Sequence, residues 1–358
     1  MLKAFRITNS NIGDIEALYE TFCKDAGPRY RWEHDPVGFD ILKKAIAGGG
    51  IGGYWLEDTG IMQDTGILEA NGKNRQTALM LFTREEHRAI EINVIHTVPQ
   101  ADGNPPPYKN ILDTLMRAFI RDLQADEAGL RTFDVISYAM MGDQEPFVRS
   151  ILWYGFKPVG QAIVKFDIMD PVSLQILKQQ APAPLPEGYR IVSWAPQYAG
   201  GVARVIYESF SKASDAQWDP RFRSELGAKK VVGMMTYGMM GDLCEESTSI
   251  LLKGEEAVGV CFLIQSSMTT GNIPLIGVLP EEKKKQFGSH LLQHTVAKTV
   301  QAILDGKMGM LSIDATHDTD NLSAIKMYRR MGFREDYNYP HVYLPTEKLR
   351  AFKPGQWC

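Results

Sequence analysis

The chain has 358 residues, of which 44% are hydrophobic and 23% are charged, and its formal net charge is −4. This length exceeds a single typical core and fits two domains, and the composition is that of a folded soluble protein. The acidic balance argues against general nucleic-acid binding, and no apolar run approaches the roughly 18 residues that a membrane span needs.

The cysteines and the N-terminal stretch indicate the compartment. The four cysteines form no C-x-x-C pair and no disulfide framework, which favours free thiols in a reducing cytoplasm rather than metal binding. The first residues, MLKAFRITNS, have no apolar signal core. We therefore expect a cytoplasmic protein that binds neither membranes nor nucleic acid.

The hydrophobic spacing of the first half alternates between the period of strands and the period of helices. Turn residues separate the segments, and three consecutive glycines close the second helix. The predicted strands are 2–7, 77–82, 89–98, 133–139 and 155 to about 168, and the predicted helices are 12–24, 36–47, 108–123 and 145–154. This order predicts a domain of mixed α/β structure.

A change of composition follows the first half. The segment 170–188, DPVSLQILKQQAPAPLPEG, ends in alternating alanine and proline, which favours an extended, semi-rigid chain with few N–H groups to pair. An ordinary long loop within one domain is the alternative, but the strand and helix pattern restarts directly afterwards. We predict a first domain at 1–169, a linker at 170–187 and a second domain at 188–358.

The second half repeats the order of the first. Predicted strands at 189–194, 249–252 and 257–265 enclose helices at about 198–210 and 221–231. Four landmarks correspond at offsets of 177 to 184 residues: Arg6-Ile7 with Arg190-Ile191, Pro99 with Pro280, Leu112 with Leu292, and Gly155-Phe156 with Gly332-Phe333. Such a small drift across ordered landmarks is typical of a duplicated unit.

One stretch of the second half, Gly271 to Phe333, carries the strongest functional pattern. It is predicted to contain a strand at 271–280, a basic turn at 281–289, a helix at 291–304, a strand at 308–315 and a helix at 321–331. Pro280 ends the strand pairing, so the N–H groups of 284–289 and the neighbouring lysines would lie at a helix start, where anions bind. A solvated lysine-rich turn before an ordinary helix explains the turn about equally well.

The second helix of this stretch, 321–331, presents one face with a candidate site. Ala324, Met327, Tyr328 and Met331 share that face at helical spacing, and the small Ala324 would let a ligand pass beside the helix. Taken singly, Tyr328 is more often a half-buried core aromatic, and Asn321 more often a helix cap. Their combination with the anion-binding turn favours the functional interpretation.

The run VLPEEKKKQFGS at 278–289, followed by Asn321, Ala324, Tyr328 and Gly332-Phe333, resembles the GNAT superfamily of acyl-CoA N-acyltransferases. The resemblance implies an α/β (α+β) fold of two tandem GNAT-like domains, each a mixed, mostly antiparallel central sheet flanked by helices. It implies acetyl-CoA as co-substrate and an amine-bearing acceptor. The cofactor-binding residues that it implies are Ile276, Val278, Leu279, Lys283, Lys284, Lys285, Gln286, Phe287, Gly288, Ser289, Asn321 and Ala324.

In that family the turn reads Arg/Gln-Gly-x-Gly-x-Gly/Ala and binds the CoA pyrophosphate through main-chain N–H groups. Here Lys283 takes the first place and Gly288 the last, whereas Lys284 and Gln286 replace the other two glycines. Because the binding is made by backbone, these replacements are tolerable if both residues avoid positive φ.

The resemblance also implies direct acyl transfer. A strand at 275–279 would pair with the pantetheine arm, and an N–H near Val278 or Leu279 would polarise the thioester carbonyl. Tyr328, with an ordinary phenol pKa of about 10, would protonate the departing thiolate. The strand carries no acidic residue that could serve as general base, which leaves the base open. The candidates are Glu245, Glu246, His317 and a water chain.

The first half lacks the same equipment. Its turn, QADGNPPPYKN at 100–110, contains three prolines without N–H groups and no basic cluster, so we expect this domain to keep the fold without the CoA site. A non-catalytic CoA-binding or regulatory protein on the same fold is the alternative function. The acceptor and the oligomeric state, monomer or homodimer, stay open. The i, i+4 pair His290 and His294 lacks a third metal ligand and is expected on an exposed or flanking helix face.

Overall fold

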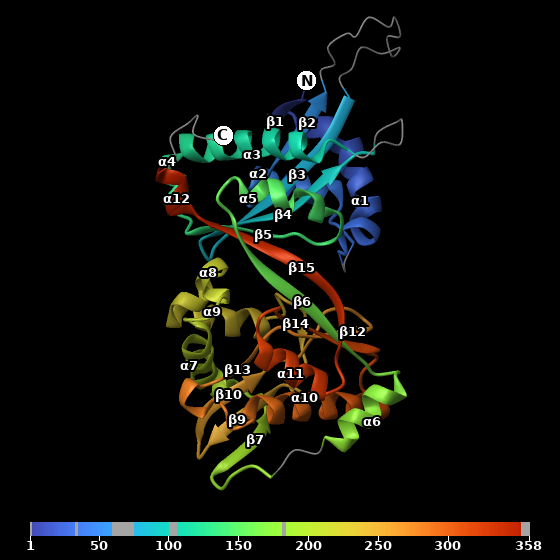
Figure 1. The fold of residues 1–358 in the computed structure, drawn as a ribbon, viewed down its shortest axis with the longest axis vertical. Helices are drawn as coiled ribbons and strands as arrows, with labels where there is room; N and C mark the ends of the chain where they lie inside the picture. Colours follow the sequence, from blue (N-terminus) through green and yellow to red (C-terminus); the bar gives the residue numbers. More distant parts are fainter. Residues whose placement is uncertain (1, 33–34, 59–74, 100–105, 181–183, 352–358) are drawn as a thin grey trace, which may run out of the picture. The chain divides into compact units, whose positions relative to one another are not determined.

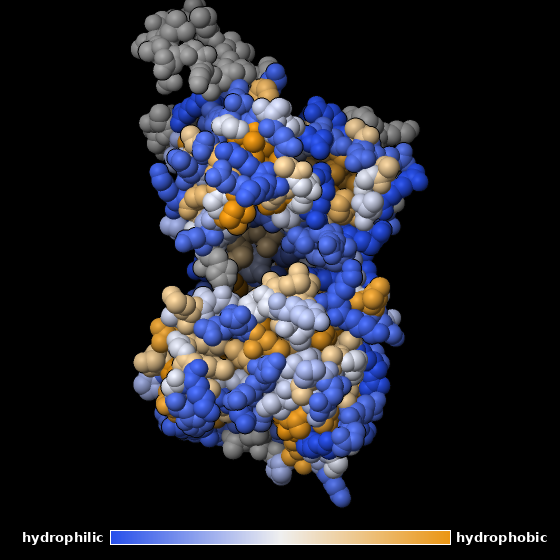
Figure 2. All heavy atoms as spheres, turned by 180° about the vertical axis from the view of Figure 1, so that it is seen from behind, coloured by the Kyte–Doolittle hydropathy of each residue, from blue (hydrophilic) through white to orange (hydrophobic). Residues whose placement is uncertain are grey.

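The structure is a computed structural model that describes residues 2–32, 35–58, 75–99, 106–180 and 184–351. The chain divides into two compact units (Figure 1). Unit 1 comprises Met1–Pro158 with Tyr339–Cys358, and unit 2 comprises Val159–Asn338. Among the described helices, none combines the length and apolar character required to cross a bilayer. Figure 2 shows hydrophilic residues over much of the visible surface of each unit, with hydrophobic residues scattered between them.

Unit 1 contains one mixed sheet with the strand order β1-β2-β3-β4-β5-β15. Every neighbouring pair is antiparallel except β4 and β5, which are parallel. The strands are β1 (Leu2–Arg6), β2 (Ile51–Asp58), β3 (Arg75–Glu85), β4 (Ala89–Thr97), β5 (Val135–Ala139) and the end of β15 (Arg334–Pro345). The helices are α1 (Glu16–Tyr30), α2 (Phe39–Ala47), α3 (Tyr108–Ala125), α4 (Glu127–Leu130), α5 (Val148–Leu152) and α12 (Thr346–Ala351).

Both faces of the unit 1 sheet are covered, because side chains alternate along its strands. On β2, Tyr54 and Leu56 belong to the core that contains α3, whereas Trp55 between them belongs to the core that contains α1. All three side chains are buried. Side-chain alternation along β2 thus directs successive residues into the two cores on opposite faces of the sheet.

Unit 2 contains two sheets, with the orders β6-β14-β12-β11-β8 and β13-β10-β9-β7. The strands are β6 (Lys157–Asp167), β7 (Tyr189–Ser193), β8 (Asp242–Leu243), β9 (Ser249–Lys253), β10 (Glu256–Cys261), β11 (Ile264–Gln265), β12 (Thr270–Ile273), β13 (Ile276–Val278) and β14 (Ser312–Asp318). The helices are α6 (Pro171–Gln179), α7 (Ala199–Phe210), α8 (Asp215–Trp218), α9 (Glu225–Thr236), α10 (Phe287–Leu304) and α11 (Leu322–Arg330). Mixed, mostly antiparallel sheets flanked by helices confirm the predicted fold class.

The prediction of one continuous strand over 271–280 is wrong. Pro274 cannot donate to a ladder, and the chain leaves one sheet and enters the other around it. β12 pairs with β14 in parallel, with Ile273 and Ala315 as the last pair, whereas β13 pairs with β10. β14 continues with β6 instead. We call this divergence of β13 from β14 the unit 2 fork.

Each unit is completed by a strand from the other half of the sequence. β6 follows the first-half helices in sequence but pairs with β14 of unit 2. The end of β15, from His341 to Pro345, pairs with β5 of unit 1. The compact units therefore differ from the division at 169 and 188, which follows the duplicated sequence. The exchange depends on strand partners, and no local pattern encodes them.

The segment predicted as an extended linker begins with a helix instead. Asp170 caps α6 by accepting hydrogen bonds from the N–H groups of Val172 and Ser173, and Pro171 occupies the first helical position. The alternating Ala-Pro part at 181–183 lies outside the described residues. The cap and the proline were visible in the sequence as a helix start, and the Ala-Pro composition obscured it.

Candidate functional site

The unit 2 fork is formed by backbone as much as by side chains. Backbone groups alternate in direction along an antiparallel strand. Leu275 accepts a hydrogen bond from the Phe262 N–H at 3.0 Å, and the Leu279 N–H donates to Val258 at 2.9 Å, so these residues face β10. The intervening groups of Ile276 and Val278 then face the fork. Ile276 is thus positioned to pair with an extended ligand.

The same alternation distinguishes the two predicted oxyanion donors, the N–H groups of Val278 and Leu279. The N–H of Leu279 is already used by Val258, so it is unsuited to polarise a thioester. The carbonyl of Val278 accepts a hydrogen bond from the Ser209 hydroxyl of α7 at 2.9 Å. The Val278 N–H is therefore the better of the two predicted donors.

The turn after β13 contains two left-handed residues, and one of them, Gln286, directly precedes the right-handed helix α10, as in an anion-binding nest. Lys284 has φ of 66° and Gln286 has φ of 63°, so the condition under which their replacement of glycine would be tolerable is not met. Alternating right- and left-handed residues direct successive N–H groups toward one concave side. A left-handed residue with a side chain costs roughly 1–2 kcal/mol. The turn therefore has the conformation for which glycine is suited, although other residues occupy it.

The three lysines of this turn have different surroundings. The Lys285 ammonium lies 2.5 Å from a carboxylate oxygen of Glu282 and also faces the rings of Tyr189 and Phe287. Lys283 and Lys284 are exposed, and neither has an ion-pair partner among the described residues. They are the two ammonium groups left for a bound anion.

Glu282 holds the start of this turn in place through hydrogen bonds. Its buried carboxylate accepts hydrogen bonds from Tyr189 at 2.8 Å, from Lys253 at 3.0 Å and from Lys285. Burial alone would raise the pKa of Glu282, but the hydrogen bonds from Lys285, Lys253 and Tyr189 lower it to about 2. The carboxylate is thus ionised at neutral pH and positions the turn.

The remaining predicted cofactor residues divide between the surface and the core. Ser289 and Ala324 are half-buried, whereas Phe287 is buried against Tyr189 and belongs to the core. A Cβ on Gly288 would lie 3.3 Å from the Met327 sulfur, so the glycine lets α10 approach α11 closely. Asn321 is exposed and caps α11 through the Ala324 N–H at 3.1 Å, the structural role that we considered for it.

Tyr328 lies in the core between α11 and the sheets. Its ring is parallel to that of His317, with centroids 5.8 Å apart, and meets Phe333 edge-on at 5.1 Å. Burial raises the pKa of Tyr328 well above its ordinary value, with a smaller contribution from Cys261, so the assumption of an ordinary phenol was wrong. Within the described residues the hydroxyl has no hydrogen-bond partner.

The candidates for the general base differ in accessibility. Glu245 and Glu246 lie on an exposed turn, whereas His317 is buried on β14. The sequence reading missed Asp215 on α8. Burial, together with the carboxylates of Asp318 and Asp219, raises the pKa of Asp215 to about 6.

A residue from the first half of the sequence also reaches this region of unit 2. The Gln161 amide of β6 donates to Asp318 at 2.5 Å, and the Ser214 hydroxyl donates to the same carboxylate. No sequence signal could have linked Gln161 to Asp318, because the strand exchange brings them together.

The corresponding place in unit 1 is filled by a side chain. The last parallel pair there is Ile92 with Tyr138, matching Ile273 with Ala315 in unit 2. Ile95 lies three residues beyond Ile92 on β4. The buried Gln144 side-chain amide accepts a hydrogen bond from the Ile95 N–H at 2.8 Å and donates one to the Ile95 carbonyl at 3.1 Å. The Tyr138 hydroxyl donates to the same amide oxygen. Unit 2 has only the methyl group of Ala315 where unit 1 has Tyr138.

The histidine pair of α10 is not on an exposed face, contrary to expectation. His290 is buried, and Nδ1 of the half-buried His294 lies 2.9 Å from the Ser249 hydroxyl. Across the part of the chain that the structure describes, no three histidine, cysteine or acidic side chains come together in a way that could hold a metal ion.

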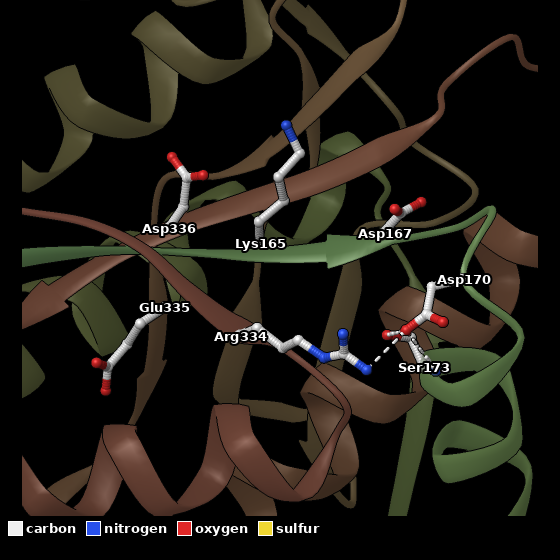
Figure 3. A pocket seen from close by; sticks show the side chains of 7 residues that line it. All are labelled: Lys165, Asp167, Asp170, Ser173, Arg334, Glu335 and Asp336. Carbon is white, nitrogen blue, oxygen red and sulfur yellow. Dashed lines mark hydrogen bonds and ion pairs between the residues drawn. The ribbon is translucent and has the colours of Figure 1, made fainter.

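A polar pocket of about 460 Å³ lies elsewhere in unit 2 (Figure 3). Its lining residues are Lys165, Asp167, Asp170, Ser173, Arg334, Glu335 and Asp336. Arg334 reaches Asp170 at 3.0 Å, so the side chain that caps α6 also neutralises this cation. None of the predicted site residues lines this pocket, and its charges are mixed.

Comparisons with known proteins agree with this geometry. Residues 208–333 match the model of the acetyltransferase (GNAT) family. A GCN5-related N-acetyltransferase from Sphaerobacter thermophilus has a similar structure, with a TM-score of 0.58, 12% identity and 96% of each chain covered. A tandem GNAT protein from the clavulanic acid biosynthesis pathway has a TM-score of 0.56 and 11% identity, with 97% of this chain and 99% of that chain covered.

A third solved structure is a glucosamine N-acetyltransferase region of a fungal multi-domain β-N-acetylglucosaminidase. Its TM-score is 0.56 at 10% identity, with 96% of this chain and 38% of that chain covered. No curated protein matches by sequence. Residues 208–333 are therefore similar to the GNAT acetyltransferase family, and the whole chain has the fold of a tandem GNAT protein.

Proposed function

We propose that this protein is an acyl-CoA-dependent N-acyltransferase that transfers an acetyl group directly from acetyl-CoA to an amine. The single active site is in the second half, at the unit 2 fork. The observation that carries the proposal is the contrast between the forks: Gln144 bridges the backbone of Ile95 in unit 1, whereas Ala315 leaves the matching backbone of Ile276 to a ligand.

Each part of the co-substrate has a candidate partner in unit 2. The pyrophosphate would bind the N–H groups of the turn between β13 and α10, assisted by the ammonium groups of Lys283 and Lys284. The pantetheine arm would pair with the backbone of Ile276, as a strand pairs with its neighbour. The Val278 N–H would stabilise the oxyanion that forms on the thioester carbonyl.

Tyr328 is the proposed acid. Burial raises the pKa of its hydroxyl, which keeps the phenol protonated and also makes it a weaker acid toward the departing thiolate. The acceptor is an amine, and its further chemistry is outside what the residues specify. The free thiols of Cys23, Cys244 and Cys261 support a cytoplasmic location. We also propose that 1–169 and 188–358 are copies of one duplicated unit, joined by 170–187, that exchange their last strands.

Two measurements on the intact chain test the function. Calorimetry with acetyl-CoA should give one site per chain, and thiol release from acetyl-CoA should depend on a primary amine from a panel containing a polyamine, an amino sugar and a lysine peptide. Two equivalent acetyl-CoA sites would overturn the single-site assignment.

The alternative, a non-catalytic CoA-binding protein, is favoured by the side chains of Lys284 and Gln286 in a turn suited to glycine. It predicts that CoA raises the melting temperature while no amine in the panel causes thiol release. An Ala315→Tyr variant, which copies the unit 1 residue, should lose acetyl-CoA binding under either function. Retained binding by a folded A315Y would contradict the proposed fork.

A further inference from the structure

One buried polar atom at the unit 2 fork, Nε2 of His317, has no hydrogen-bond partner among the described residues. Nδ1 of His317 lies 2.8 Å from the Asp318 carbonyl oxygen, which can only accept, so Nδ1 carries the hydrogen. In the neutral ring Nε2 then bears a lone pair, and this buried nitrogen has no hydrogen-bond partner among the described residues. The hydroxyl of Tyr328, whose ring is stacked on the imidazole, also makes no hydrogen bond to the described residues.

The burial of both side chains makes these missing partners informative. His317 is 7% exposed and Tyr328 is 3% exposed. A buried polar group without a hydrogen bond destabilises the fold, so such groups are rare in folded proteins and call for an explanation. A partner supplied by a bound substrate explains both atoms at once.

The position of His317 on β14 relates it to the fork. Ala315 is the last residue paired with β12, and His317 stands two residues further along, so both side chains lie on the same face of the strand. α11 covers that face, since Tyr328 stacks on His317 and packs in the same core as Ala315. The imidazole therefore lies where β13 and β14 have separated.

We propose that Nε2 of His317 is the general base of the acyl transfer, an inference that rests on the proposed function. The amine nitrogen attacks the thioester carbonyl carbon, a C–N bond forms, and the nitrogen gives one proton to Nε2. The C–S bond breaks, and the thiolate takes the hydroxyl proton of Tyr328. The imidazolium then returns its proton to the phenolate, directly or through one water, which restores both rings. The net change is one proton moved from nitrogen to sulfur.

The charged and titratable neighbours of His317 are compatible with this role. Tyr328 faces the ring from α11, and Cys261 of β10 lies close enough to Tyr328 to influence its pKa. The adjacent Asp318 alternates to the opposite face of β14, where it receives hydrogen bonds from Ser214 and Gln161. The Asp318 carboxylate in turn helps to raise the pKa of Asp215 on α8.

A substitution at His317 with a matched histidine control tests the inference. His317→Gln keeps a polar side chain of similar size but offers no basic nitrogen, so kcat/KM with acetyl-CoA and the best amine of the panel should fall about 100-fold or more. The acidic limb of the pH profile should flatten. His294→Gln, which removes the half-buried histidine of α10, should change neither quantity by more than about threefold.

Binding measurements separate the possible outcomes. Acetyl-CoA affinity of H317Q, measured by calorimetry, should stay within about threefold of the wild type, which shows that the fork is intact. Turnover and a pH profile like those of the wild type in such a variant would overturn the role of His317 alone. Absence of amine-dependent turnover in the wild-type chain would overturn the proposed function, and this inference with it.

Discussion

Replacing Gln144 with alanine should destabilise unit 1 more than an ordinary loss of a surface glutamine. The side chain is 1% exposed and makes both available hydrogen bonds to the backbone of Ile95, at 2.8 and 3.1 Å. It also accepts from Tyr138, which is fully buried. The glutamine amide thus pairs with one strand residue much as a neighbouring peptide group would.

The expected magnitude follows from the groups left behind. Gln144→Ala leaves the Ile95 N–H, the Ile95 carbonyl and the Tyr138 hydroxyl without their hydrogen-bond partner. Each buried unpaired group costs about 1–3 kcal/mol. The vacated space is polar and can admit water, which lowers the total. We therefore expect the free energy of unfolding to fall by about 3 kcal/mol.

Urea denaturation followed by tryptophan fluorescence measures this loss. The matched control is Gln76→Ala, because the Gln76 amide donates a single hydrogen bond to the Asp14 carbonyl at an exposed site. The control should cost less than about 1 kcal/mol. A Q144A protein as stable as the control would refute the view that this side chain substitutes for a strand partner.

Three further predictions concern unit 2. Tyr328→Phe should lower turnover about 100-fold with CoA affinity by calorimetry nearly unchanged, and unaltered turnover would remove its acid role. The pKa of Glu282 falls from 4.5 to about 2 on folding, so the ionised carboxylate stabilises the folded protein by at most about 3 kcal/mol. This contribution is complete above pH 4.5 and is lost as the pH falls through 2. Urea midpoints of Glu282→Gln should lack this pH dependence. Gln286→Gly should retain CoA binding. Gln286→Val places a β-branched residue at positive φ and should weaken CoA binding more than tenfold in calorimetry. Equal CoA affinities of the two variants would contradict the proposal that the backbone of this turn binds the pyrophosphate.

Much of the element order and the position of the basic turn could be predicted because both are local. Apolar spacing reports which side of a segment is buried, and proline and glycine report where segments end. Helices such as α3 and α11 and the strand β4 lie where those signals placed them, whereas β14 begins four residues later than predicted. The duplication was also visible, since it is a comparison of the sequence with itself.

The backbone conformation of single residues could not be predicted from the sequence. Lysine and glutamine normally avoid positive φ, so nothing in the letters at 284 and 286 indicated a left-handed backbone. Surrounding structure imposes it, since Glu282 anchors the start of the turn and α10 must begin at Phe287. The ordinary pKa assumed for Tyr328 failed for a similar reason, because burial is a property of the packed core.

The sequence by itself determined that two related halves follow one another and that the turn at 281–289 suits an anion. Only the tertiary structure decided which strands pair. In the structure, β6 from the first half of the sequence pairs with β14, and the end of β15 from the second half pairs with β5. The structure also places β12 and β13 in different sheets. It brings Gln144 to Ile95 and His317 to Tyr328. Strand pairing joins residues far apart in the chain through backbone groups that every residue carries, so no side-chain pattern records the partner.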